Sequence, residues 1–279
     1  MIRLALRCRA EEAEAVLAEL LEVAPSGVEE VADPDGLRGL VEYAVYGAPG
    51  ELPDVGLLEA SAGDAFVEVT TRELPDDWDE RWKRFYFPVL VGGKLYVRPP
   101  WERPAERGGV HEIVIDPGGA FGTGTHPTTR MCLELMLEAG SGRGRSFCDL
   151  GCGSGVLAIA AAKLGFGPVC GIDADQAAIA ESGRNARANG AEIDLRHADL
   201  RGDVPPVADV VAANLTSRLV EEIARRWWEA RSAPGMLIAS GFLRDETDRV
   251  GSALRAAGLE EKRRLVSGDW SALLLHSQR

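Results

Sequence analysis

The stretch Asp149-Leu150-Gly151-Cys152-Gly153-Ser154-Gly155 decides the fold of this chain. A hydrophobic segment at 146–150, typical of a buried strand, leads into it, and a segment at 156–164 with helical character follows it. Glycines in such a loop let the backbone approach a ligand closely, and the following helix offers unpaired backbone N–H groups. The stretch therefore predicts a ligand-binding loop in which Gly151 and Gly153 are candidate binding residues.

The spacing of the glycines narrows the class of ligand. A dinucleotide-binding fingerprint needs a third glycine at position 156, where this chain has Val156. A P-loop needs Gly-Lys followed by Ser or Thr, and the stretch has no such sequence. The pattern Asp-x-Gly-x-Gly-x-Gly instead suits a ligand without a pyrophosphate group, namely S-adenosylmethionine.

From about residue 87 onward, predicted strands and helices alternate, which is typical of a doubly wound parallel sheet. The predicted strands are 146–150, 169–173, 193–197, 208–214 and 236–240, and the predicted helices are 128–139, 156–164, 176–189, 218–231 and 245–257. Two strands then follow each other across the turn 267–269. We therefore expect an α/β, Rossmann-like sheet with an antiparallel C-terminal hairpin, unlike the sheet of dinucleotide-binding dehydrogenases.

Polar side chains follow the predicted strands, where ligands of open α/β sheets bind. Asp173 ends the second strand, and its carboxylate can accept two hydrogen bonds from a ribose diol. Its alternative role is to cap the next helix, for which Asp175 is better placed. Asp199 follows the third strand and either accepts a hydrogen bond from an adenine amino group or lies in a surface turn.

Asn214 ends the fourth strand, where it would lie beside the reacting group of the ligand. An uncharged amide there can hold an attacking nitrogen without neutralising its lone pair. Asn214, Thr216 and Ser217 could alternatively cap the helix that follows.

A second loop, at 116–129, is rich in glycine and threonine and leads into the helix predicted at 128–139. It forms a flexible backbone cradle with several hydroxyl groups and one aromatic ring, Phe121. A lone histidine such as His126 caps or packs a helix more often than it acts as a base or a metal ligand.

The first 72 residues differ in composition from the rest of the chain. They hold 15 acidic residues against five arginines, whereas the remaining chain is nearly balanced. Predicted strands at 2–8, 27–32, 38–46 and 65–71, with helices at 11–21 and 51–60, indicate a ferredoxin-like β-α-β-β-α-β module. Trp78, Trp82 and Phe85 then share one face of a short helix, which either packs as a connection or grips a substrate.

Composition excludes several classes of protein. A hydrophobic fraction of 46% and a charged fraction of 27% are ordinary for a globular protein of 279 residues. The formal net charge of −13 argues against a chain whose main task is to grip nucleic acid. No apolar run is long enough to span a membrane, and the N-terminus does not resemble a secretory leader. The five cysteines are odd in number and scattered, which argues against a disulfide framework and a zinc site and favours a reducing compartment.

Four segments together resemble the ribosomal protein L11 methyltransferase (PrmA-type) family of class I S-adenosylmethionine-dependent methyltransferases. They are the loop 116–129, the glycine loop with its helix at 149–160, the segment 171–175 and Asn214-Leu215. The loop 116–129 is specific to that family, whereas the glycine loop alone indicates only a class I methyltransferase. The resemblance also covers 78–82, 100–101 and 268–270, and it is weakest over residues 1–70.

The resemblance implies three parts: a substrate-recognition domain at 1–72, a linker helix at 73–86 and a methyltransferase domain at 87–279. It implies that the cofactor contacts Thr129, Gly151, Asp173 and Asn214, and that Phe121 and Gly122 lie against it. The implied reaction moves methyl groups to lysine side chains or the N-terminal amine of the basic ribosomal protein L11, with S-adenosylhomocysteine as product. From the cysteines, which favour a reducing compartment, we expect a cytoplasmic protein, and we also expect a monomer that needs no metal.

Two alternatives remain open at this point. The same cofactor residues would serve a methyltransferase of another protein or of a small metabolite. A non-catalytic module that binds a ribosomal protein and retains a cofactor pocket would bind the cofactor without turnover. Asn214-Leu215-Thr216-Ser217 lacks the Asn-Pro-Pro-aromatic motif of related glutamine and adenine methyltransferases, which disfavours planar amide or base substrates.

Overall fold

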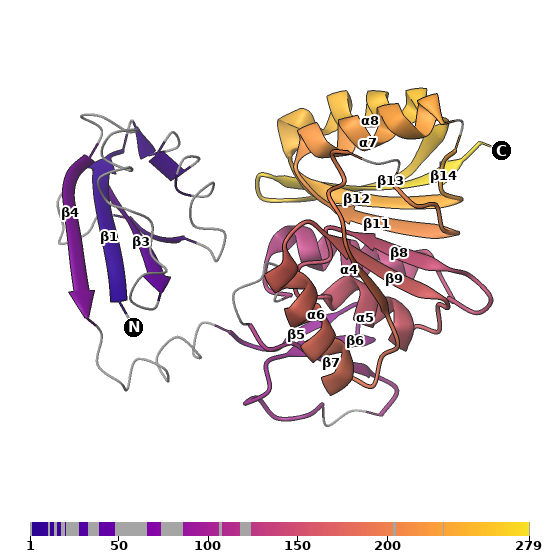
Figure 1. Ribbon diagram of the computed structural model, residues 1–279, viewed down its shortest axis with the longest axis horizontal. Helices are drawn as coiled ribbons and strands as arrows, with labels where there is room; N and C mark the ends of the chain where they lie inside the picture. The colour runs from indigo at the N-terminus through magenta and orange to yellow at the C-terminus, as the bar shows by residue number, and fades with distance from the viewer. Residues whose placement is uncertain are drawn as a thin grey trace. The chain divides into compact units, whose positions relative to one another are not determined.

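The computed structural model describes residues 2–10, 12–13, 16–17, 20, 28–32, 39–47, 66–73, 86–105, 108–117, 124–202, 205–230 and 232–278. The chain divides into two compact units, residues 1–85 and 86–279, and each is described here by itself (Figure 1). Within the described residues, no helix combines the length and the hydrophobicity that crossing a membrane requires.

The first unit contains a four-stranded antiparallel sheet. Its strands are β1 (Ile2–Arg9), β2 (Glu29–Ala32), β3 (Leu40–Gly47) and β4 (Phe66–Glu73), in the spatial order β2-β3-β1-β4. The third strand thus lies between the first and second, as a split β-α-β arrangement requires. The helix predicted at 51–60 and most of the one at 11–21 lie outside the described residues, so the ferredoxin-like assignment stays a prediction.

Alternation along β1 explains why this segment is a strand with one face in the core. Leu4 and Leu6 are buried, while Arg3 and Arg7 lie on the opposite face. There both guanidinium groups pair with the Glu42 carboxylate, at 2.5 and 2.7 Å. Burial of Glu42 acts to raise its pKa, but the hydrogen bonds from the two arginines lower it overall.

The second unit is built on a seven-stranded, mostly parallel sheet with the order β10-β9-β8-β11-β12-β14-β13. Its strands are β8 (Phe147–Leu150), β9 (Val169–Asp173), β10 (Asp194–His197), β11 (Val210–Asn214), β12 (Met236–Leu243), β13 (Leu259–Ser267) and β14 (Trp270–Ser277). Neighbours from β10 to β12 pair in parallel, whereas β14 is antiparallel to both β12 and β13. The predicted α/β class with a parallel, Rossmann-like sheet is confirmed.

Helices cover both faces of this sheet (Figure 1). They are α4 (Pro127–Glu138), α5 (Val156–Lys163), α6 (Gln176–Ala188), α7 (Ser217–Glu229) and α8 (Thr247–Ala256), the last preceded by the 3-10 turn η4 (Arg244–Glu246). Each predicted helix of this unit agrees with the observed one to within about two residues at its ends.

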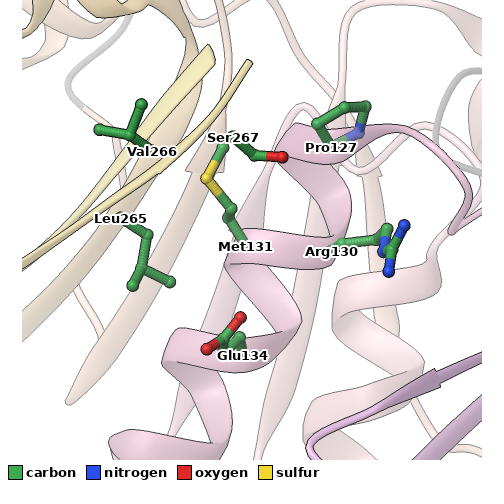
Figure 2. Close-up of a pocket in the computed structure, with 7 residues that line it drawn as sticks. All are labelled: Pro127, Arg130, Met131, Glu134, Leu265, Val266 and Ser267. Atoms are coloured by element: carbon green, nitrogen blue, oxygen red, sulfur yellow. The ribbon is translucent and has the colours of Figure 1, made fainter. Parts of the chain in front are cut away.

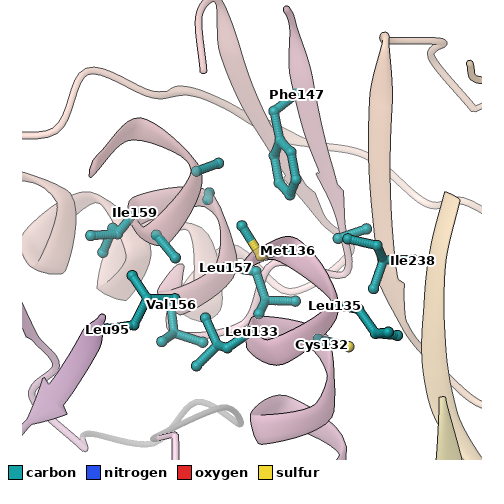
Figure 3. Close-up of a cluster of buried hydrophobic side chains, with 14 of the residues drawn as sticks. Leu95, Cys132, Leu133, Leu135, Met136, Phe147, Val156, Leu157, Ile159 and Ile238 are labelled. Atoms are coloured by element: carbon teal, nitrogen blue, oxygen red, sulfur yellow. The ribbon is translucent and has the colours of Figure 1, made fainter. Parts of the chain in front are cut away.

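Strand β11 shows how the two-residue period of a strand divides the core. Val210 and Ala212 belong to the hydrophobic cluster that α4 and α5 cover, and Val211 and Ala213 to the one that α7 and α8 cover. Figure 3 shows the first cluster, in which Phe147 of β8 meets side chains of α4 and α5. Because β11 is buried on both faces, its sequence is a continuous apolar run rather than an alternation.

Three short strands precede the main sheet, and the sequence analysis did not predict them. They are β5 (Val89–Val91), β6 (Leu95–Arg98) and β7 (His111–Val114), and they form a separate three-stranded sheet. Leu95 and Ile113 are fully buried in the same cluster as α4 and α5. Strands of three or four residues offer too few positions for a period to be recognised.

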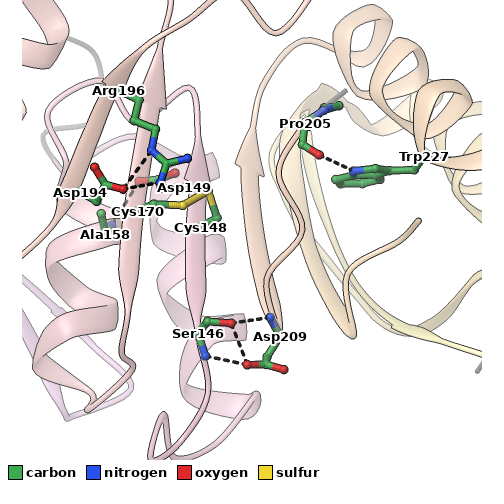
Figure 4. The surroundings of a disulfide bond; sticks show 10 residues. All are labelled: Ser146, Cys148, Asp149, Ala158, Cys170, Asp194, Arg196, Pro205, Asp209 and Trp227. Carbon is green, nitrogen blue, oxygen red and sulfur yellow. Dashed lines mark hydrogen bonds and ion pairs between the residues drawn. A yellow bond between two sulfur atoms is a disulfide. The ribbon is translucent and has the colours of Figure 1, made fainter. Parts of the chain in front are cut away.

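A disulfide joins Cys148 of β8 to Cys170 of β9, a pairing that the sequence analysis, which expected no disulfide framework, did not predict (Figure 4). The two residues are partners in the parallel register, with Cα atoms 4.7 Å apart. Two cysteines 22 residues apart in sequence give no signal of such a pairing, because only the alignment of the two strands brings them together.

Asp149 is a buried acid beneath helix α5. Asp149 is 1% exposed, and its Oδ2 accepts a hydrogen bond from the Ala158 backbone N–H at 3.1 Å. Its Oδ1 has no hydrogen-bond partner in the described part of the chain. Burial, helped by the nearby charge of Asp173, raises the pKa of Asp149 to about 8 even though the bond from Ala158 opposes the shift.

We expect the pH dependence of stability to change in Asp149→Asn. The folded wild type holds this proton more tightly than the unfolded chain, whose Asp has a pKa of about 3.9. The stabilising contribution is therefore complete below about pH 4 and is lost as the pH rises toward 8, by at most ~1.4 kcal/mol per pH unit. Denaturant unfolding from pH 4 to 8 should show the wild type losing stability relative to the variant. Parallel curves for the two proteins would contradict the raised pKa.

Candidate functional site

The candidate residues of the second unit gather at the carboxyl edge of its parallel strands. Strand β8 leads into the glycine loop 151–155, β9 ends at Asp173, and β11 ends at Asn214. Leu150 and Ile172 are register partners, so the loop and Asp173 begin side by side. The parallel alignment thus brings together residues that are up to 63 positions apart in sequence.

The glycine loop is held against the end of β9 by its own backbone. The Gly151 and Cys152 N–H groups both donate to the Ile172 carbonyl oxygen, at 2.8 and 2.9 Å. Gly151 has φ +73°, and a Cβ there would lie 2.4 Å from a methyl carbon of Leu215. Only glycine fits this position, because the conformation is left-handed and the loop passes close to the residue that follows Asn214.

Asp173 braces the glycine loop as well as ending its strand. Its Oδ2 accepts from the Gly153 N–H and its Oδ1 from the Asp175 N–H, each at 2.9 Å. Asp175 caps α6 by accepting from the Ala177 N–H at 2.8 Å, so the predicted division of roles between the two acids is confirmed for Asp175. A carboxylate oxygen has further lone pairs, which leaves Asp173 able to accept bonds from a ligand.

Asp199 lies beyond the end of β10, and its side chain is 55% exposed. Its Oδ1 accepts from the Arg201 N–H at 2.9 Å and from Arg201 Nε at 3.2 Å. The backbone hydrogen bond from Arg201 and the guanidinium group lower the pKa of Asp199. The surface-turn alternative describes this arrangement, and the adenine contact stays a prediction.

The Asn214 side chain contacts Thr129, a fully buried residue in the first turn of α4. The amide Nδ2 of Asn214 lies 3.5 Å from the Thr129 Oγ1, to which it donates. Its Oδ1 is buried and has no hydrogen-bond partner among the described residues. Thr216 rather than Asn214 is the N-cap residue of α7, so the capping alternative for Asn214 is wrong.

The loop 116–129 is described only at its two ends, 116–117 and 124–129, so Phe121 and Gly122 lie outside the described residues. His126 is the N-cap of α4, with its Nδ1 2.7 Å from the Thr128 hydroxyl, as the capping interpretation predicted. Its ring also packs edge-on against Trp270, with centroids 5.0 Å apart. Burial lowers the pKa of His126, which favours the neutral ring.

Asn185 is a site-building residue that the sequence analysis missed. Its Nδ2 donates to the Ser154 carbonyl oxygen at 2.9 Å, and its Oδ1 accepts from the Asp116 N–H at 3.1 Å. One buried amide therefore joins the glycine loop to the start of the loop 116–129. Asn189, one turn later, bonds both the N–H and the carbonyl of Val114 in the same way. The sequence signal was Asn185 itself, an asparagine inside a helix, where this residue type is unfavourable, four residues before the C-cap residue Asn189.

Gly241 is a second residue that was missed. It has φ +91°, and a Cβ there would lie 2.5 Å from the Leu215 carbonyl oxygen. The neighbouring Ser240 carbonyl accepts from the Leu215 N–H at 2.8 Å. Gly241 thus lets β12 pass close to the segment that positions Asn214, at the point where the register of β12 with β14 shifts. An isolated glycine inside a strand is the sequence signal for such a close approach.

A cavity of about 330 Å³ lies between α4 and the end of β13 (Figure 2). It is lined by Pro127, Arg130, Met131, Glu134, Leu265, Val266 and Ser267. None of the candidate cofactor residues lines it, although Thr129 belongs to the same helix. We therefore locate the site by its polar side chains and backbone geometry rather than by this cavity.

Comparison with known proteins agrees with this geometry. The chain matches the family of ribosomal protein L11 methyltransferases (PrmA) over residues 56–278. It is 37% identical to the ribosomal protein L11 methyltransferase of Alkaliphilus oremlandii over 226 residues, which are 80% of this chain and 70% of that protein. It is 36% identical to that of Desulforapulum autotrophicum over 253 residues, 86% of this chain and 83% of that protein.

Among solved structures, the chain is similar to the ribosomal protein L11 methylase of Lactobacillus delbrueckii subsp. bulgaricus. The TM-score is 0.62 at 27% sequence identity, and the match covers 70% of this chain and 100% of the other. The family match spans the glycine loop, Asp173 and Asn214, the same residues that the fold gathers at one edge of its sheet. The chain therefore belongs to the ribosomal protein L11 methyltransferase (PrmA) family.

Proposed function

We propose that this protein transfers methyl groups from S-adenosylmethionine to amino groups of ribosomal protein L11, namely lysine side chains, the N-terminal amine or both. The observation that carries the proposal is the Asn214 Oδ1, a buried acceptor without a partner among the described residues, at the carboxyl edge of the sheet. A buried polar atom of this kind is normally satisfied by a ligand or water. Its place beside the glycine loop of a methyltransferase family points to the acceptor amine.

The described residues fit S-adenosylmethionine as the cofactor. The glycine loop presents Gly151 and Gly153 without side chains, and Asp173 is oriented by two backbone hydrogen bonds. In the proposed arrangement Asp173 holds the ribose, Asp199 the adenine, and Thr129 and Asn214 the region of the sulfonium. Phe121 and Gly122 complete the contacts in the proposal, as the family resemblance implies.

The chain's own task in the reaction is to position a neutral amine. The bound cofactor supplies an electrophilic methyl group on its sulfonium, which a nitrogen lone pair can attack. A lysine amine has an ordinary pKa of about 10.4, so it must lose a proton before it reacts, and transfer into a closed pocket lowers its pKa. Asn214 accepts an N–H of the amine through Oδ1 and leaves the lone pair free. Positioning of this kind contributes large rate factors without a side-chain base.

The N-terminal part provides the proposed docking surface for the substrate protein. Residues 1–72 hold 15 acidic residues against five arginines, and a ribosomal protein that binds RNA carries the opposite charge. The four-stranded order β2-β3-β1-β4 supports the ferredoxin-like assignment of this part. We propose residues 73–86 as the linker and 87–279 as the catalytic domain, acting as a monomer in the cytoplasm.

The test is transfer of labelled methyl groups to purified L11, followed by mass mapping of the product. We expect label on lysine or the N-terminal amine. Binding of S-adenosylhomocysteine without label on L11 would overturn the assigned substrate and direct the search to other proteins or metabolites. Binding without transfer to any acceptor would favour a non-catalytic module. Absence of binding would overturn the assignment of the glycine loop.

In Asp173→Ala, the affinity for S-adenosylhomocysteine should fall about 10- to 100-fold. Loss of hydrogen bonds to a charged group typically costs about 1.5–3 kcal/mol, and the variant also releases the Gly153 N–H. Calorimetry measures the affinity. Asp175→Ala is the matched control, because it removes a neighbouring acid that caps α6 and is expected to change the affinity only slightly. Equal losses in both variants would indicate a role for Asp173 in the fold alone.

Asn214→Asp should shift the pH–rate profile of methyl transfer to higher pH. A carboxylate in place of the amide stabilises the ammonium form of the acceptor, so the amine loses its proton at higher pH. We expect a shift of about one pH unit and a rate near pH 7 reduced about tenfold or more. Asn214→Ala provides the comparison, with a lower rate and an unshifted profile. An unshifted profile in Asn214→Asp would contradict the proposed contact with the amine.

A further inference from the structure

The Cys148–Cys170 disulfide joins the two strands that carry the cofactor loops. Strand β8 continues into the glycine loop, and β9 ends at Asp173. The two cysteines are register partners, and two residues further along each strand the pair Leu150 and Ile172 begins the site. No other covalent bond in the described part of the chain links separate strands.

The two cysteine residues of the disulfide differ in their exposure. Cys148 is 0% exposed, whereas Cys170 is half-buried and lines a cavity of about 220 Å³ at the opposite edge of the sheet from Asp173. Ser146, Pro168 and Ala208 line the same cavity, and Figure 4 shows Ser146 hydrogen-bonded to Asp209 beside it. Of the two cysteines, Cys170 is therefore the one that a small thiol would approach, from the edge that the cofactor residues do not occupy.

The three remaining cysteines, Cys8, Cys132 and Cys152, are poorly placed to react with small thiols or disulfides. Cys152 is 5% exposed, and burial raises its pKa to about 12. Burial also raises the pKa of Cys8 and of Cys132. Because the thiolate is the reacting species, these three cysteines stay unreactive near neutral pH.

We propose that Cys148 and Cys170 form a reversible redox modification site, which exchanges with low-molecular-weight thiols and disulfides through Cys170 and sets the affinity for the cofactor. On oxidation, the Cys170 thiolate attacks a small disulfide RSSR and releases one RS⁻. The Cys148 thiolate then attacks the Cys170 sulfur and releases the second RS⁻. The net reaction converts RSSR and two protein thiols into one protein disulfide and two RSH.

The oxidised form should bind the cofactor more tightly. The bond restricts movement of β8 against β9, and with it movement of the glycine loop against Asp173, to which Gly153 is hydrogen-bonded at 2.9 Å. A site held closer to its bound geometry loses less conformational freedom on binding. This inference rests on the proposed function only for its ligand, S-adenosylhomocysteine.

The experiment compares the full-length protein equilibrated with reduced or with oxidised glutathione. Intact mass after alkylation of free thiols counts the protein disulfides, and calorimetry measures the dissociation constant for S-adenosylhomocysteine. We expect one disulfide in the oxidised wild type and, after reduction, a dissociation constant about three- to tenfold higher. Cys170→Ser should show the reduced value under both conditions. Cys8→Ala, which removes a buried thiol of the other unit, should behave like the wild type.

Three results would overturn the proposal. They are failure of the pair to oxidise, equal dissociation constants in the two states, and a reduced form that binds more tightly. If Cys170→Ser is poorly folded, Cys170→Ala replaces it, and the oxidised and reduced wild type still give the comparison of dissociation constants. Absence of binding in both states would overturn the coupling together with the proposed function, whereas binding that ignores the oxidation state overturns the coupling alone.

Discussion

The parallel pairing of β8 with β9 is the constraint on which the rest of the site depends. It places the Ile172 carbonyl where it accepts two N–H groups of the glycine loop, and it places Asp173 where it accepts a third. These three hydrogen bonds satisfy backbone N–H groups of the glycine loop that its tight turn would otherwise leave unpaired. The loop is therefore shaped by the neighbouring strand before any ligand arrives, and its geometry follows the register of the sheet.

Buried amides extend this frame to segments that are distant in sequence. Asn185 of α6 bonds backbone groups of the glycine loop and of Asp116, and Asn189, the C-cap residue of the same helix, bonds those of Val114. Each of these amides has its partners, as buried polar groups normally do. The Asn214 Oδ1 differs because it has none in the described part of the chain. That contrast separates the amides that build the site from the one that we propose to contact the substrate.

The two units divide the proposed task according to their charge. The acidic N-terminal part suits a basic substrate protein, and the nearly balanced second unit carries the transfer chemistry. Cys148 and Asp149 are consecutive residues within β8, the strand that leads into the glycine loop. Both groups lie within three residues of the glycine loop, which is why the proposed redox coupling acts through this strand.

The sequence by itself determined the alternation of strands and helices in residues 146–276, the glycine loop, and the roles of Asp175 and His126 as helix caps. These features follow from local physics: hydrophobic period, glycine spacing and short-range hydrogen bonds. The short strands β5–β7, the tertiary roles of Asn185 and Gly241, and the pairing of Cys148 with Cys170 were decided by the tertiary structure alone. Each depends on which segments become neighbours, and neither residue type nor spacing along one segment carries that information. The same reason explains Asn214: its sequence position placed it at the end of a strand, but only packing against α4 buried its amide and left one oxygen without a partner among the described residues.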